Sequence, residues 1–180
     1  MSKVRIAING FGRIGRTTAR AILQNDALEL IAVNDLADVA TLAHLFKYDS
    51  VHGKFKGNIE VGENLIRINE KPVYLYSSKN PEDLPWNDLK IDVVIESTGM
   101  FLTKEAASKH ISAGAKKVII SAPPQGEGVK VVVMGVNDKS LTGDETVLSN
   151  ASCTTNCVAP LVKVLDELWG IENGYITTVH

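Results

Sequence analysis

The residues best suited to covalent chemistry lie in the segment Ser149 to Cys157, where a cysteine is surrounded by hydroxyl side chains. The thiolate form of cysteine is a nucleophile, and a helix N-terminus or a neighbouring imidazolium favours that form. Cys153 falls in the first turn of an expected long helix, with Asn150 and Ser152 as alternative N-caps. His180, the last residue of the chain, supplies an imidazole later in the sequence. The pattern predicts a nucleophilic cysteine that a histidine assists.

Each of these side chains also has an interpretation without chemistry. Cys153 could be a buried, inert thiol, and His180 taken alone would more often be a surface or packing histidine. Cys157 lies one turn deeper among apolar neighbours, so we expect it to be a buried packing residue. A zinc site is not expected, because the two cysteines lack two further ligands at suitable spacing. The remaining histidines are expected to be surface or packing residues: His44, His52 and His110.

A glycine pattern near the N-terminus predicts a dinucleotide-binding turn. Gly10-x-Gly12-x-x-Gly15 falls between an expected strand and an expected helix. The glycines allow a tight turn, close approach of the backbone to a pyrophosphate, and close helix–strand packing. Asp35 follows Gly15 by 20 positions, where a carboxylate would accept hydrogen bonds from a ribose and repel a 2′-phosphate. NAD is therefore expected rather than NADP; the alternative is a glycine-rich packing turn with Asp35 merely ending a strand.

Further contacts to a nucleotide are expected where later strands end, because such folds bind ligands at the carboxyl ends of their strands. Ser97-Thr98-Gly99 follows the strand expected at 91–95, and Ser121 follows the strand expected at 117–120. Both segments could equally well be ordinary turns that have no role in binding.

Alternation of strand and helix patterns predicts an α/β fold with a doubly wound, mostly parallel sheet of the Rossmann type. A small antiparallel insertion is expected within residues 50–90, where glycines and a proline separate short apolar runs. The expected strands are 3–9, 28–33, 54–56, 59–61, 65–68, 73–76, 91–95, 117–120, 129–134 and 147–148, with a turn and a last strand within 171–180. The expected helices are 13–23, 39–46, 104–113 and 152–169.

Composition excludes several other classes of protein. The 180 residues carry a net charge of -2, so nothing demands a membrane or a nucleic acid as partner. The apolar runs are too short to span a bilayer, and the N-terminal residues lack the longer apolar stretch that is typical of a signal peptide. Two cysteines four positions apart make no disulfide framework, which favours a cytoplasmic, reducing setting. The chain stops within its expected terminal strand, which indicates a fragment of a longer protein; a native end on an edge strand is the alternative.

The chain closely resembles the phosphorylating, NAD-dependent glyceraldehyde-3-phosphate dehydrogenases. The resemblance covers all of this chain and about the first half of a family member, and the motif around Cys153 is its most specific part. The segments that carry it are 8–16, 33–35, 47–53, 96–99, 116–123, 149–157 and 177–180.

The resemblance implies a reaction and its residues. Cys153 would attack the aldehyde of glyceraldehyde 3-phosphate, and His180 would raise the reactivity of the thiol and take the proton. Hydride would pass to NAD, and inorganic phosphate would attack the resulting thioester to release 1,3-bisphosphoglycerate. Ser152 and Thr154 match family residues that hold the attacking phosphate.

The cofactor contacts follow by the same positional match. Arg13 and Ile14 correspond to backbone contacts with the pyrophosphate, and Asp35 to the contact with the adenosine ribose. Lys79 stands where many members carry an arginine near the adenine. The full set implied to bind NAD is Gly10, Gly12, Arg13, Ile14, Gly15, Asp35, Lys79, Thr98 and Ser121.

The resemblance also implies an NAD-binding domain over 1–150, the truncated start of a catalytic domain over 151–180, and a homotetramer in the full-length protein, acting in glycolysis. One departure is an apparent extra residue in Met100-Phe101-Leu102-Thr103, beside the cofactor. Two other functions remain open: an erythrose-4-phosphate dehydrogenase, which needs no phosphate acceptor, and a non-catalytic nucleotide-binding module with a redox-sensing cysteine. A cysteine protease would not explain the glycine turn.

Overall fold

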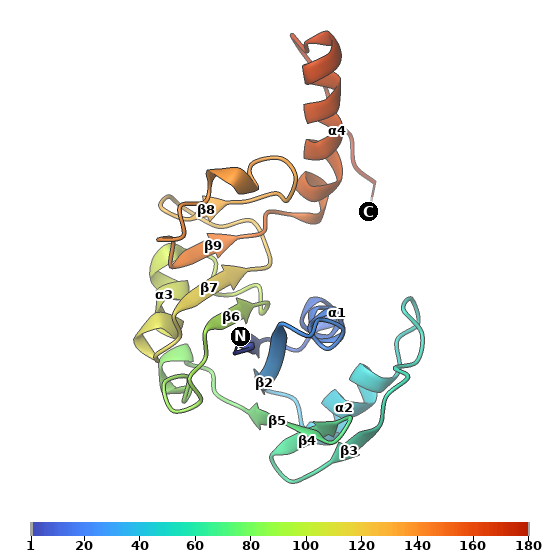
Figure 1. Ribbon diagram of the computed structural model, residues 1–180, viewed down its shortest axis with the longest axis vertical. Helices are drawn as coiled ribbons and strands as arrows, with labels where there is room; N and C mark the ends of the chain where they lie inside the picture. The colour runs from blue at the N-terminus through green and yellow to red at the C-terminus, as the bar shows by residue number, and fades with distance from the viewer. Residues whose placement is uncertain (1, 180) are drawn as a thin grey trace.

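The computed structural model describes residues 2–179, and its core is a single sheet of nine strands in the order β3-β4-β5-β2-β1-β6-β7-β9-β8 (Figure 1). The seven strands from β5 to β8 across the sheet run parallel to one another. The strands are β1 Val4–Asn9, β2 Leu28–Asn34, β3 Ile59–Val61, β4 Leu65–Ile68, β5 Lys71–Tyr76, β6 Val93–Glu96, β7 Lys117–Ile120, β8 Lys130–Val131 and β9 Val147–Ser149. The α-helices are α1 Arg13–Ile22, α2 Val39–Lys47, α3 Lys104–Ser112 and α4 Cys153–Trp169. The predicted doubly wound α/β fold is confirmed.

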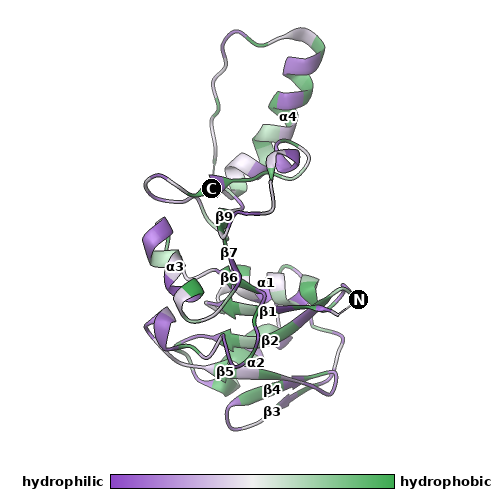
Figure 2. Cartoon of the chain, turned by 60° about the vertical axis from the view of Figure 1, so that its left-hand side comes forward, coloured by the Kyte–Doolittle hydropathy of each residue, from purple (hydrophilic) through white to green (hydrophobic). Residues whose placement is uncertain are grey.

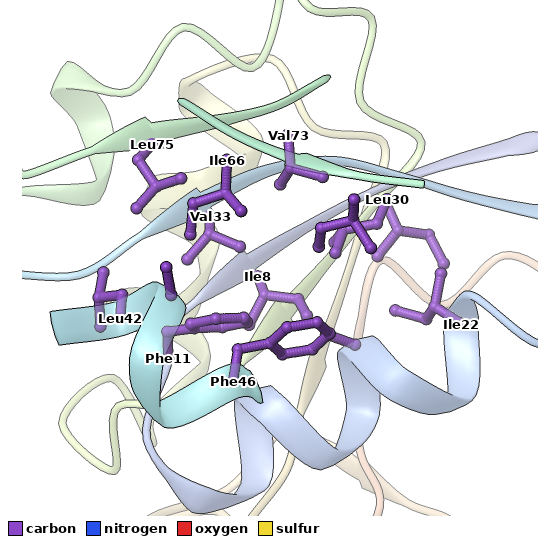
Figure 3. Close-up of a cluster of buried hydrophobic side chains, with 14 residues drawn as sticks. Ile8, Phe11, Ile22, Leu30, Val33, Leu42, Phe46, Ile66, Val73 and Leu75 are labelled. Atoms are coloured by element: carbon purple, nitrogen blue, oxygen red, sulfur yellow. The ribbon is translucent and has the colours of Figure 1, made fainter. Parts of the chain in front are cut away.

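Helices cover both faces of the sheet because the central strands are apolar on both sides. In β1, Ile6 and Ile8 belong to a cluster with residues of α1 and α2, whereas Ala7 belongs to a second cluster with α3 on the opposite face. Figure 3 shows the first cluster, in which the rings of Phe11 and Phe46 stack at a centroid distance of 5.7 Å. Burial on both faces is typical of a parallel strand and explains the continuous apolar run at the N-terminus.

The expected antiparallel insertion is present and extends the main sheet. Strand β4 pairs antiparallel with both β3 and β5, and β5 in turn pairs parallel with β2. Buried Ile66, Ile68 and Val73 join the cluster beneath α1 and α2. The insertion therefore shares the core of the nucleotide-binding half of the sheet.

Three expected strands differ in the structure. Residues 54–56 form no strand, because the Phe55 N–H donates to the Lys47 carbonyl at the end of α2. The strand expected at 129–134 shortens to β8, since the Val133 N–H turns to the side chain of Asn137. Residues 171–179 form no regular structure, and His180 lies outside the described residues.

Helix α4 stands away from the sheet (Figures 1 and 2). None of its residues is buried, and its exposed large apolar side chains are Leu161, Val162, Val164, Leu165, Leu168 and Trp169. Within residues 2–179, no helix combines the length and apolar character needed to cross a membrane.

Candidate functional site

The carboxyl ends of the parallel strands form one level edge. Asn34 of β2 is in register with Asn9 of β1, and Asn9 is in register with Glu96 of β6. The row continues through Ile120 of β7 to Ser149 of β9. The loops that follow these five strands therefore leave the sheet at the same height, and they carry almost every residue that the sequence predicts to be functional.

The glycine turn after β1 is packed as the sequence predicts. Gly10 has a φ of 89°, and a Cβ there would lie 2.7 Å from the backbone of Ser97 and Thr98. A Cβ on Gly15 would lie 2.1 Å from the Gly10 carbonyl oxygen, so α1 approaches the turn as closely as a backbone can. At Gly12, the N-cap of α1, a Cβ would meet nothing within 4 Å. The turn is closed toward the sheet and open at the helix N-terminus, where an anion is stabilised.

Asp35 is positioned at the end of β2 by backbone donors. Its Oδ2 accepts a 2.6 Å hydrogen bond from the Phe11 N–H, and its Oδ1 accepts one of 3.0 Å from the Ala37 N–H. Arg16, which sequence reasoning did not single out, donates from Nη1 to the Phe11 carbonyl at 2.8 Å. The acidic side chain and the glycine turn are thus held together as one unit.

A cavity of about 500 Å³ opens along this edge, within the usual size range of cofactor sites. Its lining residues are Asn9, Gly10, Asn34, Asp35, Leu36, Ser78, Lys79, Thr98, Met100 and Phe101. Four residues of the predicted cofactor set line it: Gly10, Asp35, Lys79 and Thr98. An apolar cavity with a carboxylate at one strand end and an open helix N-terminus beside it fits a dinucleotide.

The other predicted cofactor residues lie around the cavity rather than in its wall. Gly12, Arg13 and Ile14 are exposed at the start of α1, and Gly15 is buried beneath them. Ser121 is half-buried directly after β7, and its N–H donates to the Glu96 carbonyl at 2.9 Å. The structure therefore brings these residues to the same edge without making them part of the cavity surface.

Behind the cavity lies a buried polar network that sequence reasoning did not find. Asn9, Asn34, Glu96 and His110 are each at most 5% exposed. Their side chains are joined by hydrogen bonds of 2.6–3.0 Å that connect three strands and α3. The one available signal is the polar residue at the end of each apolar strand, and the expectation of a surface or packing histidine at His110 does not include this network.

Cys153 begins α4, as predicted, and is exposed. Ser152 is the N-cap, and its Oγ accepts a 2.9 Å hydrogen bond from the Thr155 N–H. Asn150, the other candidate, is not the cap; its backbone carbonyl accepts a hydrogen bond from the side chain of Asn156. Ala151 precedes the cap with a φ of 60°, a left-handed conformation that costs energy for a residue with a side chain. A strained turn therefore directly precedes the helix N-terminus at which the thiol lies.

The prediction that Cys157 is buried is wrong. Cys157 is exposed, because α4 buries none of its residues against the rest of the described chain, residues 2–179. Thr154 is half-buried beside Cys153. The predicted base His180 lies outside the described residues, so the structure does not place it. Within the described chain, no three His, Cys, Asp or Glu side chains are grouped so as to hold a metal ion.

Comparisons with known proteins show which family the chain resembles. Residues 4–104 match the family model described as "Glyceraldehyde 3-phosphate dehydrogenase, NAD binding domain", and residues 152–180 match that of the C-terminal domain. The chain is 56% identical over 176 residues to the glyceraldehyde-3-phosphate dehydrogenase of Clostridium acetobutylicum, an alignment that covers 98% of this chain and 52% of the relative. It is 53% identical over 178 residues to those of Thermotoga maritima and Geobacillus stearothermophilus, with 98% of this chain and 53% of each relative covered. The chain spans about half the length of the curated relatives it matches.

Proposed function

The chain belongs to the glyceraldehyde 3-phosphate dehydrogenase family, and on that premise we propose that it is part of an NAD-dependent oxidoreductase. The reaction is the oxidation and phosphorylation of glyceraldehyde 3-phosphate to 1,3-bisphosphoglycerate, a step of glycolysis. The observation that carries this proposal is a cysteine at a helix N-terminus, reached by one short loop from the sheet edge that also forms the dinucleotide cavity.

Cys153 is the proposed nucleophile. Its Sγ forms a bond with the aldehyde carbon, and the thiol proton passes to His180. Oxidation of this adduct leaves an acyl group on Sγ as a thioester, which inorganic phosphate cleaves to release the acyl phosphate and restore the thiol. A thioester retains the energy of the oxidation in a form that phosphate can capture, which an ordinary serine ester does not. Ser152 and Thr154 flank the thiol and are proposed to hold the phosphate.

NAD, when bound, supplies the hydride acceptor. The residues proposed to hold it are Asp35 at the adenosine ribose, Lys79 near the adenine, and Thr98 and Ser121 at the strand ends beyond β1. The turn through Gly10, Gly12 and Gly15, with the backbone of Arg13 and Ile14, is proposed to hold the pyrophosphate. The closed packing beneath Gly15 and the open space at Gly12 support this assignment.

We place the boundary between the NAD-binding and catalytic domains at residues 150 and 151. Two observations support this boundary: β9 ends at Ser149, and no residue of α4 is buried. A homotetramer in the cytoplasm is proposed for the full-length protein. Two free, exposed cysteines suit a reducing compartment.

The decisive experiment measures NADH formation by the full-length protein with and without inorganic phosphate, offering glyceraldehyde 3-phosphate and erythrose 4-phosphate separately. Turnover that requires phosphate and prefers glyceraldehyde 3-phosphate is expected. Cys153→Ser should abolish turnover while Cys157→Ser, the matched control on the same helix, should retain it. Turnover independent of phosphate would indicate the erythrose-4-phosphate enzyme, and NAD binding without any turnover would indicate the redox-sensing module. The comparisons favour neither alternative.

A further inference from the structure

Asn34, the last residue of β2, extends the pairing of β2 with β5 beyond the end of β5. The two strands pair in parallel up to Asn34 and Tyr76, and the Asp35 N–H donates to the Tyr76 carbonyl at 3.0 Å. Beyond Tyr76, the side-chain amide of Asn34 bonds to the backbone of Ser78 in both directions. Its Oδ1 accepts from the Ser78 N–H at 2.8 Å, and its Nδ2 donates to the Ser78 carbonyl at 2.9 Å. A side-chain amide thus replaces the peptide group that a longer strand would offer.

The orientation of this amide is set by its neighbours. A backbone N–H only donates and a carbonyl only accepts, so Oδ1 and Nδ2 of Asn34 cannot exchange places. The second N–H of Nδ2 donates to Oδ1 of Asn9 at 2.7 Å. Asn34 is 5% exposed and Asn9 is 1% exposed. Both amide hydrogens of Asn34 are therefore used within the protein, and although Asn34 lines the cavity it has no N–H left for a ligand.

The segment that Asn34 holds belongs to the loop after β5. The Ser78 hydroxyl donates to the Asn80 carbonyl at 3.0 Å and accepts from the Asn80 N–H at 3.2 Å. Lys79 lies between these two residues, so its backbone is held on both sides, and it is exposed. Ser78 and Lys79 both line the cavity. One buried asparagine thus determines where the lysine enters the cavity wall.

This loop borders the adenosine end of the proposed cofactor site. Asp35, the proposed partner of the adenosine ribose, follows Asn34 directly and lines the same cavity as Lys79. Leu36 lines this cavity as well. A lysine ammonium interacts favourably with the face of an aromatic ring and with hydrogen-bond acceptors, and adenine offers both. The position of the loop after β5 therefore bears on how tightly the adenosine is held.

We propose that Asn34 is a positioning residue for NAD, whose buried amide holds Ser78 and Lys79 as a preformed wall at the adenosine end of the cavity. Asn34 acts through this segment rather than by donating to the cofactor. The inference rests on the NAD-binding role proposed above. A wall that is in place before the ligand arrives loses less conformational entropy on binding, so preorganisation raises affinity.

The test is a double-mutant cycle on the full-length protein, with NAD affinity measured by titration calorimetry. Asn34→Ala removes the amide and is expected to weaken NAD binding about tenfold, because the loop must then be ordered by the ligand. In a Lys79→Ala background the same substitution should cost at most about threefold, because the side chain through which Asn34 acts is gone. Residues that act independently would show the same loss in both backgrounds.

Asn137→Ala is the matched control. Asn137 also bonds to the backbone in both directions, accepting from the Val133 N–H at 2.8 Å and donating to the Val131 carbonyl at 3.0 Å, but it does not line the cavity. Its NAD affinity should stay within about twofold of wild type. In steady-state assays, Asn34→Ala should raise the KM for NAD and keep kcat within about twofold, whereas a merely structural defect would lower kcat by reducing the active fraction.

An equal loss of affinity in both backgrounds, no loss in Asn34→Ala, or a fall in kcat without a rise in KM would overturn the positioning role. Failure of the wild-type protein to bind NAD would overturn the cofactor assignment itself, and the positioning role with it. Should Asn34→Ala not fold, hydrogen exchange of the wild-type Ser78 amide decides. Protection of this amide without NAD supports the preformed wall, and protection only when NAD is bound overturns it.

Discussion

The backbone N–H of Phe11 donates a 2.6 Å hydrogen bond to Oδ2 of Asp35, and this bond ties the glycine turn after β1 to the end of β2. Each carboxylate oxygen holds one backbone donor and keeps a free lone pair, so the acid is oriented before a ligand arrives. The same residue that recognises a ribose in the proposed complex therefore also shapes the turn that faces the pyrophosphate.

Asp35→Ala should weaken NAD binding and reduce discrimination against NADP. The substitution removes an acceptor for the ribose hydroxyls and the negative charge that repels a 2′-phosphate. A loss of about tenfold in NAD affinity follows from one hydrogen bond to a charged group. Titration with NAD and NADP in parallel measures both effects.

Asp35→Asn separates the two contributions, because an amide oxygen still accepts one backbone hydrogen bond while the charge is lost. Its discrimination against NADP should fall as far as in Asp35→Ala, with a smaller loss of NAD affinity. Asp26→Asn, an exposed acid outside the cavity, serves as the control. Unchanged affinities for both nucleotides in Asp35→Ala would remove Asp35 from the site.

Two glycine substitutions should separate packing from ligand contact. Gly15→Ala places a Cβ 2.1 Å from the Gly10 carbonyl oxygen, so α1 must move. Overpacking of this kind lowers the free energy of unfolding by about 1–3 kcal/mol. Gly12→Ala meets nothing within 4 Å and has a compatible φ of -66°, so the fold should be unaffected.

NAD binding should nevertheless be weakened in Gly12→Ala, since the added methyl group occupies the open face at the N-terminus of α1. Urea denaturation and NAD titration of both variants provide the measurement. Full NAD affinity in Gly12→Ala would show that the pyrophosphate lies elsewhere.

Ser152 should have two separable roles. Ser152→Ala removes the Oγ that accepts from the Thr155 N–H, and loss of an N-cap costs about 1 kcal/mol. Hydrogen exchange at the Thr155 amide should accelerate. Ser152→Asn retains an N-cap and should keep that amide protected, yet both variants should raise the KM for phosphate if the hydroxyl holds it. A phosphate KM unchanged in both would assign Ser152 to capping alone.

Asp92 should contribute stability that depends on pH. The backbone N–H of Arg5 and the ammonium of Lys116 hold the pKa of Asp92 below its ordinary value of 3.8. A lowered folded-state pKa gives stability that is present above pH 3.8 and is lost as the pH falls through the lowered value. Asp92→Asn should therefore unfold at lower urea than wild type at pH 7.

The difference between Asp92→Asn and wild type should shrink as the pH falls from 3.8 through the lowered pKa, because the wild-type carboxyl becomes protonated over that range. Asp26→Asn should show no such pH-dependent difference. A constant gap between Asp92→Asn and wild type from pH 7 to pH 3 would contradict the assignment.

Local pattern was enough to predict most of the elements. The expected strand 117–120 and the expected helix 152–169 differ from β7 and α4 by at most one residue. The glycine turn was equally predictable, since it is local to one strand, one turn and one helix. The strand expected at 54–56 failed because strand formation needs a partner, and the backbone of Phe55 pairs with the end of α2 instead.

The amino-acid sequence by itself determined the strands, the glycine turn and the position of Cys153 within its helix, because each depends on residues close together in the chain. Only the tertiary structure decided what lies behind the cofactor cavity. Asn9 and His110 are 101 positions apart, and their contact exists only because β1 and β6 are neighbours in the sheet and α3 covers them. Hydrogen bonds between buried side chains leave no periodic signal along the chain. The partners of Glu96 could therefore not be predicted from the sequence.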